Sequence, residues 1–148
     1  MSELYDDDIL LWSERQAKLL RRLAAGERVN DQIDWDNLAE EVEDVGRSQL
    51  TAVESPLLHA LVHMLKAAAW PLSTDAPSWR GDARGFRVQA RRRYAPSMRQ
   101  RLDLAGLYAD ALRALPETMD GQPPQPVPQT CTMTLDELLS GSDTPADR

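Results

Sequence analysis

The feature that most constrains this chain is a helical repeat of apolar residues that extends over residues 35 to 70. Its members recur at steps of three and four, with one step of eight after Val45: they are Trp35, Leu38, Val42, Val45, Val53, Leu57, Leu61, Leu65 and Ala68. That spacing places them on one stripe of an α-helix. Asp34 is a suitable N-cap, and Pro71 ends the helix because proline cannot donate the helical hydrogen bond. We therefore expect one long helix from Trp35 to Trp70.

Pro56 lies inside this repeat and leaves two interpretations open. Ser55 and Pro56 have the pattern of a helix cap followed by a first helical residue, so two helices could meet there. A proline inside a helix otherwise produces a kink. We favour a single kinked helix, because the apolar period continues on both sides of Pro56.

Three further helices are predicted around the long one. The first has an apolar stripe made by Tyr5, Ile9, Trp12, Gln16, Leu19, Leu20 and Leu23. Three aspartates, Asp6, Asp7 and Asp8, lie in its expected first turn, and Gly26 lies just beyond its end. The third, capped by Ser78, carries Trp79, Ala83, Phe86, Ala90 and Tyr94. The fourth opens at Pro96 and carries Met98, Leu102, Ala105, Ala109, Leu112 and Leu115.

The C-terminal segment has a different character. Five prolines between residues 116 and 128 predict an extended linker. Thr134 and Glu137 then form a capping box that opens a short helix, and a loose tail follows from Gly141. No strand pattern occurs in the sequence. We predict an all-α fold: a four-helix up-and-down bundle of residues 1–115, with a kinked second helix. Residues 116–148 supply the linker, a short capping helix and a tail, packed on the same single domain.

Charge is unevenly distributed along the chain. The net charge is -7, yet residues 61 to 115 hold 10 basic residues against 4 acidic ones. This balance disfavours nonspecific nucleic-acid binding by the whole molecule. Cys131 is the one cysteine, the N-terminus is acidic, and no apolar run is long enough to span a bilayer. We therefore expect a cytoplasmic protein that has neither a disulfide nor a membrane span.

The sequence resembles an uncharacterised bacterial and cyanobacterial family, domain of unknown function 29. The resemblance is carried by Leu4, Tyr5, Asp6, Trp12, Gln16, residues 34–43 and 46–48, residues 63–66, Trp70, Pro71, Ser78, Trp79, Arg91, Pro96, Ser97 and residues 128–131. It departs from the family pattern at Ala95 and Thr132, positions that bear on helix caps and turns. The resemblance implies an all-helical fold and supplies no catalytic residues.

Arginines dominate the third predicted helix and its flanks. Between Ser78 and Arg101 there are eight arginines, no lysine and a single acid, Asp82. One hypothesis is that Arg84, Arg87, Arg91 and Arg92 form a binding face for an acidic partner or a phosphate. The other is that antiparallel packing of the second and third helices neutralises residues 80–93 internally, through Asp36, Glu40 and Glu43. The sequence leaves both hypotheses open.

Motifs for catalysis and metal binding are sparse. His59 and His63 share a helix face, and Glu40 and Glu41 are nearby acids, but no further cluster of ligands accompanies them. We therefore predict no metal and no cofactor, with these four residues as weak metal candidates. Cys131 has uncharged neighbours, and the tryptophans lie at core or rim positions. Nucleophile motifs and phosphate-binding glycine loops are absent.

These observations favour a non-enzymatic helical interaction module. Its arginine-rich third helix is predicted to bind a protein partner or a second copy of the chain. The alternative is nucleic-acid or anion binding by the same face, and a metal-binding or enzymatic activity has the least support.

Overall fold

The computed structural model describes residues 2–141 and is helical throughout its regular structure. Within this range there is no strand, only an isolated antiparallel bridge between Met119 and Gln122. The predicted all-α class is therefore confirmed. Contacts divide the chain into two compact units, Met1–Arg47 and Ser48–Arg148. The predicted single domain and four-helix up-and-down arrangement stay predictions, and residues 142–148 of the predicted tail lie outside the described range.

The first unit contains α1 (Ser2–Asp7), α2 (Ile9–Ala24), the short 3-10 helix η1 (Asn30–Gln32) and the N-terminal part of α3. The prediction of one helix over α1 and α2 was wrong. Asp8 breaks it, because its backbone leaves the helical region at φ -149° and its carboxylate accepts a hydrogen bond from the Leu11 N–H. An aspartate in that position caps a new helix. Gly26, with φ +95°, follows the end of α2 as predicted.

The long helix α3 (Trp35–Ala69) is continuous through Pro56. Ser55 and Pro56 therefore do not open a second helix, and the one-helix interpretation holds. The predicted stripe is buried only in its second half, at Val53, Leu57, Leu61 and Leu65.

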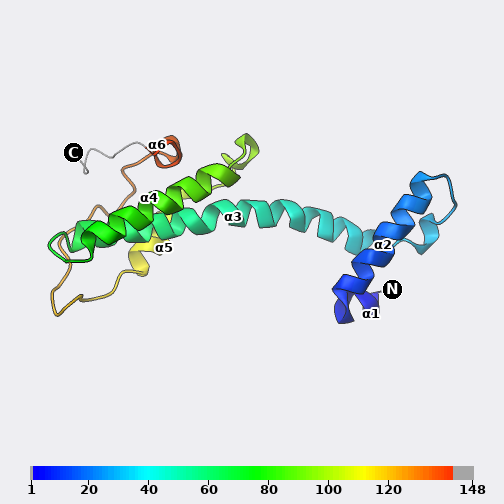
Figure 1. Cartoon of the computed structure of the whole chain (residues 1–148), viewed down its shortest axis with the longest axis horizontal. Coiled ribbons are helices and arrows are strands. Elements are labelled where there is room, and N and C mark those ends of the chain that lie inside the picture. Colours follow the sequence, from blue (N-terminus) through cyan, green and yellow to red (C-terminus); the bar gives the residue numbers. More distant parts are fainter. Residues whose placement is uncertain (1, 142–148) are drawn as a thin grey trace. The chain divides into compact units, whose positions relative to one another are not determined.

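In the second unit, α4 (Ala76–Arg93) packs antiparallel to α3 (Figure 1). Phe86 stacks on His63 at a ring-centroid distance of 5.5 Å, and the Lys66 amine lies over the Trp79 ring. The predicted fourth helix was wrong in its extent. Only a 3-10 turn, η2 (Pro96–Met98), forms at the proline, and α5 (Leu104–Arg113) begins after Asp103. The Asp103 carboxylate accepts a hydrogen bond from the Gly106 N–H and starts that helix.

The C-terminal helix α6 (Leu135–Ser140) opens with the predicted capping box of Thr134 and Glu137. Leu138 and Leu139 of α6 are buried in the core of the second unit, together with residues of α3, α4 and α5. The linker before α6 is held to the end of α3: the Gln125 N–H donates to the Ala69 carbonyl at 2.8 Å. None of the helices in the described part of the chain is both long and apolar enough to cross a membrane.

Candidate functional site

The four arginines predicted to form a binding face lie on α4, but they do not share one environment. Arg84, Arg91 and Arg92 are exposed, whereas Arg87 is only 4% exposed. The cause is the helical period. Arg87 follows Ala83 by four residues and precedes Ala90 by three, so it shares the buried face of α4 with these two alanines.

Arg87 holds α6 against α4. Its Nε donates to the Leu138 carbonyl and its Nη2 to the Glu137 carbonyl, both at 2.9 Å. These carbonyls lie in the last turn of a helix, where backbone oxygens lack helical partners and the helix dipole favours positive charge. Arg87 therefore serves the internal packing of the second unit and does not belong to the exposed face.

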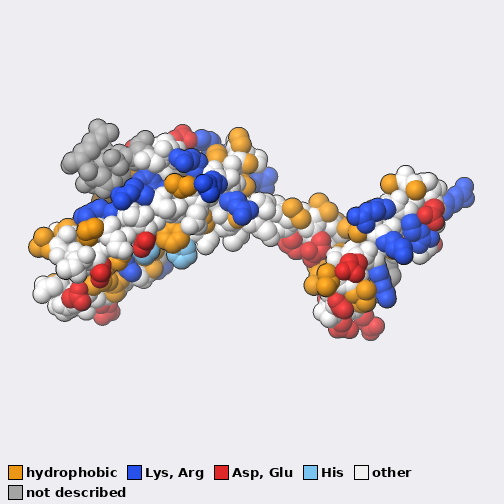
Figure 2. All heavy atoms as spheres, viewed as in Figure 1, with side chains coloured by type: hydrophobic (Ala, Val, Ile, Leu, Met, Phe, Trp, Pro, Cys, Tyr) orange, Lys and Arg blue, Asp and Glu red, His pale blue; other side chains and the backbone are white. Residues whose placement is uncertain are grey.

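The other three arginines form what we call the α4 basic face: Arg84, Arg91 and Arg92. Figure 2 shows basic side chains gathered along α4. Within the described part of the second unit, no carboxylate lies within salt-bridge distance of these three guanidinium groups. Arg99 differs, because it pairs with Asp136 at 2.5 Å and thereby lowers the pKa of that carboxyl. The predicted binding role of the α4 basic face stays a prediction.

Two of the three acids predicted to neutralise these arginines have a partner in their own helix. Glu40 and Glu43 bind Arg47 of the same helix, at 2.9 and 3.4 Å. The predicted ion pairs between these acids and the arginines of α4 stay a prediction.

Each of the four weak metal candidates contacts another residue. The Glu41 carboxylate accepts a hydrogen bond from the Tyr5 hydroxyl at 2.5 Å, which raises the pKa of Tyr5 to about 12. Glu40 binds Arg47, and the rings of His59 and His63 pack on Phe86. Among the described residues, no group of three or more histidine, cysteine, aspartate or glutamate side chains is placed to hold a metal ion.

His63 predicts a pH response of the second unit. Burial lowers its pKa below 6.5, although Asp82 opposes the shift and Lys66 and His59 reinforce it. Its Nδ1 is buried without a hydrogen-bond partner. Because the folded state favours the neutral ring, stability is full above pH 6.5 and falls as the pH drops towards the lowered pKa. We expect the melting temperature of His63→Leu to fall less than that of the wild type over this range. A His59→Leu variant, which alters the exposed histidine, is the control, and equal slopes for wild type and His63→Leu would contradict the assignment.

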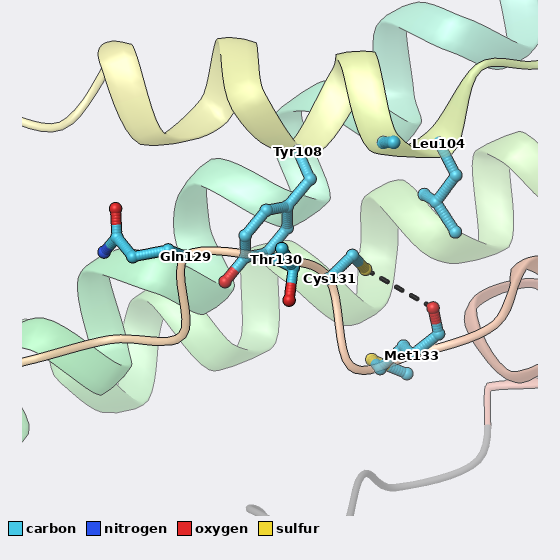
Figure 3. A pocket seen from close by; sticks show the side chains of 7 residues that line it. Leu104, Tyr108, Gln129, Thr130, Cys131 and Met133 are labelled. Carbon is cyan, nitrogen blue, oxygen red and sulfur yellow. Dashed lines mark hydrogen bonds between the residues drawn. The ribbon is translucent and has the colours of Figure 1, made fainter.

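A shallow pocket of about 290 Å³ lies between α5 and the chain leading to α6 (Figure 3). It is lined by Leu104, Ala105, Tyr108, Gln129, Thr130, Cys131 and Met133. Burial raises the pKa of the Cys131 thiol, which donates a hydrogen bond to the Met133 carbonyl at 3.3 Å. A protonated, hydrogen-bonded thiol is a poor nucleophile. The Tyr108 hydroxyl, in turn, donates to the Pro128 carbonyl. These contacts stabilise the linker and supply no catalytic group.

Sequence reasoning missed a buried polar network in the first unit. Asp34 is 8% exposed and accepts hydrogen bonds from the Trp12 indole at 3.0 Å and the Asn37 amide at 2.8 Å. Its own N–H donates to Gln16, which is also buried. The signal was present in the sequence, because a glutamine on an otherwise apolar stripe needs a buried polar partner.

The first unit also leaves apolar side chains uncovered. Trp35 is 50% exposed, and Val42 and Val45 are each 65% exposed. Figure 2 shows apolar and acidic side chains next to one another on the N-terminal part of α3. The predicted stripe is therefore correct as a helical pattern, but its first half is an exposed surface instead of a core.

The regular structure of residues 2–141 is helical, and α4 carries an exposed row of arginines. These two features define an all-helical protein with a basic surface helix. The family model of the domain of unknown function DUF29 matches residues 4–142. The chain therefore belongs to this family, as its motifs predicted. A crystal structure of an alpha-helical protein of unknown function from Rhodospirillum rubrum is similar in fold, with a TM-score of 0.64 and 24% sequence identity. The match covers 93% of this chain and 90% of that one. No curated protein matches the sequence.

Proposed function

We propose that this protein is a non-enzymatic interaction module that binds an acidic protein surface through the α4 basic face. The observation that carries the proposal is the exposure of Arg84, Arg91 and Arg92 without a carboxylate from the described part of their own unit. Three adjacent positive charges repel one another in the free protein, and an acidic partner removes that repulsion.

The chemistry of the face favours a protein partner. Arginine forms paired hydrogen bonds with carboxylates, and the face is built from arginine without lysine. Val88 lies on the same side of α4 and is 37% exposed, so a partner also finds apolar area there. Nucleic acid is the alternative. The aromatic residues of α4, Trp79 and Phe86, belong to its packed side, so stacking platforms for bases are lacking on the basic face.

The test is native mass spectrometry of the tagged protein purified gently from its own cells. We expect a stoichiometric added mass of a protein, lost in the variant Arg84→Glu, Arg91→Glu, Arg92→Glu. Reversing three interfacial charges is expected to weaken binding roughly a hundredfold or more. Arg101→Glu, which changes an exposed arginine of the same unit outside α4, is the matched control and is expected to retain the partner.

Three other results would count against the proposal. An added mass of nucleic acid, with binding that weakens steeply in salt, would support the alternative. A chain with no added mass would show that no stable complex forms. A partner that stays bound to the triple variant would show that it binds elsewhere on the molecule.

A further inference from the structure

The N-terminal part of α3 presents an exposed face that we call the α3 strip: Trp35, Ala39, Val42 and Gly46. These residues recur at steps of four, three and four, so they line one side of the helix. All four are exposed, and the Trp35 indole is held at the surface by a hydrogen bond to the Asn30 carbonyl at 2.8 Å. A tryptophan and a valine that alternate with two small residues make an exposed apolar surface on which another helix can pack.

Acids flank the α3 strip on one side. Asp36, Glu40 and Glu43 follow one another at steps of four and three, and all are exposed. Within residues 2–141, Arg47 is the basic residue that pairs with this row. The row keeps net negative charge, which favours a basic partner and opposes pairing of the strip with itself.

The outer side of α4 has the complementary composition. Arg84, Val88 and Arg92 recur at steps of four, and Gly85 lies beside them. Val88 and Gly85 match the apolar and small residues of the α3 strip, because the glycine leaves room for close approach. The two arginines match the acids beside the strip. One chain therefore carries both halves of a charge-complementary helix pair.

Two helix-interior glycines support this match. A glycine within a helix costs about 1 kcal/mol relative to alanine, so its presence calls for a reason. A Cβ added at Gly46 or at Gly85 would meet nothing within 4 Å. The described packing within the chain therefore gives no reason for either glycine, whereas close approach of a second helix does.

We propose that the occupant of the α3 strip is the outer side of α4 from a second copy of this chain. The inference rests on the proposed function and deepens it by naming the acidic partner of the α4 basic face. Every copy carries both surfaces, so two copies can make the same contact twice. The α3 strip and the outer side of α4 are then covered on both copies, and the assembly closes as a symmetric dimer.

The test is sedimentation velocity of the full chain over a wide range of concentration and salt. We expect a dimer that dissociates on dilution and on addition of NaCl. Two charge-reversal variants, Glu40→Lys with Glu43→Lys and Arg84→Glu with Arg92→Glu, should each weaken self-association roughly tenfold or more. An equimolar mixture of the two variants should restore a dimer, because both contacts then join opposite charges: one has the native polarity and the other the reversed polarity. Glu14→Lys and Arg101→Glu are the controls, since each changes an exposed residue outside both surfaces.

A second variant tests the contact without altering charge. Gly85→Leu fills open space in the chain, so the fold should be kept, but the added side chain should abolish dimerisation. Ala68→Leu is the control, because Ala68 is an exposed small residue elsewhere on α3. Circular dichroism melting of each variant verifies the fold.

The outcomes separate this inference from the proposed function. A chain that is monomeric at every concentration overturns the inference, yet the α4 basic face could still hold a different acidic protein in native mass spectrometry. A dimer that resists the glutamate reversal but is lost on arginine reversal also overturns it, because another acidic surface would then be the partner. If arginine reversal affects neither the dimer nor any captured protein, both proposals fail.

Discussion

Replacing Arg87 by methionine is expected to destabilise the protein by about 3 kcal/mol or more, because hydrogen bonds from a charged donor contribute about 1.5–3 kcal/mol each and at least two are lost. The Leu138 and Glu137 carbonyls would be left without this donor in a buried position. Methionine fills similar volume, so the loss reports mainly the polar contacts. The release of α6 would also uncover Leu138, which is fully buried in the native state.

Urea denaturation followed by circular dichroism measures this change, and hydrogen exchange of the α6 amides measures the local release. Arg84→Met is the matched control, because an exposed arginine on the same helix should change stability by no more than about 0.5 kcal/mol. Equal stability of the two variants would show that Arg87 is not the residue that holds α6.

The burial of Arg87 shows where sequence reasoning ends. The apolar stripe correctly predicted α4, and its period already places Arg87 between Ala83 and Ala90 on the packed side. Whether an arginine there reaches solvent or is covered depends on the segment that packs over it. That segment is α6, some fifty positions later in the sequence, and no local pattern links the two.

Two helix boundaries with local causes were predicted from the sequence. The capping box of Thr134 and Glu137 fixes the start of α6, and Pro71 closely follows the end of α3. The breaks at Asp8 and Asp103 also have local causes. Each carboxylate accepts a hydrogen bond from the N–H three residues later, which is a pattern that the sequence contains. The apolar period continues across both aspartates, so it predicted an unbroken helix at each of them. In the structure the helix is interrupted at both.

The N-terminal half of α3 illustrates a different limit of sequence-based prediction. The period of Trp35, Val42 and Val45 states that one side of the helix is apolar, but it does not state what covers that side. In the second half of α3 the same period is covered by α4, α5 and α6. An identical sequence pattern therefore becomes core in one half and exposed surface in the other.

Replacing Asp34 by alanine is expected to destabilise the first unit by about 3 kcal/mol, because a buried donor left unpaired costs about 1–3 kcal/mol and a lost N-cap about 1 kcal/mol. The Trp12 indole N–H would lose its acceptor inside the unit, and Asn37 would lose its contact at the start of α3. Urea denaturation and hydrogen exchange of the α2 amides measure the change. Asp36→Ala is the control, because Asp36 lies in the same helical turn but is exposed.

The acid response provides an independent check on Asp34. Hydrogen bonds from Asn37 and Trp12 lower the pKa of Asp34 below its ordinary value of 3.8, although burial opposes the shift. Its stabilising contribution is therefore complete above pH 3.8 and is lost as the pH falls through the lowered pKa. The alanine variant should lack this part of the acid-induced loss, so its deficit relative to the wild type should shrink as the pH falls below that value. A deficit that stays constant with pH would mean that the lost contacts do not depend on the charge of Asp34, and that packing around Trp12 and Gln16 holds the unit together.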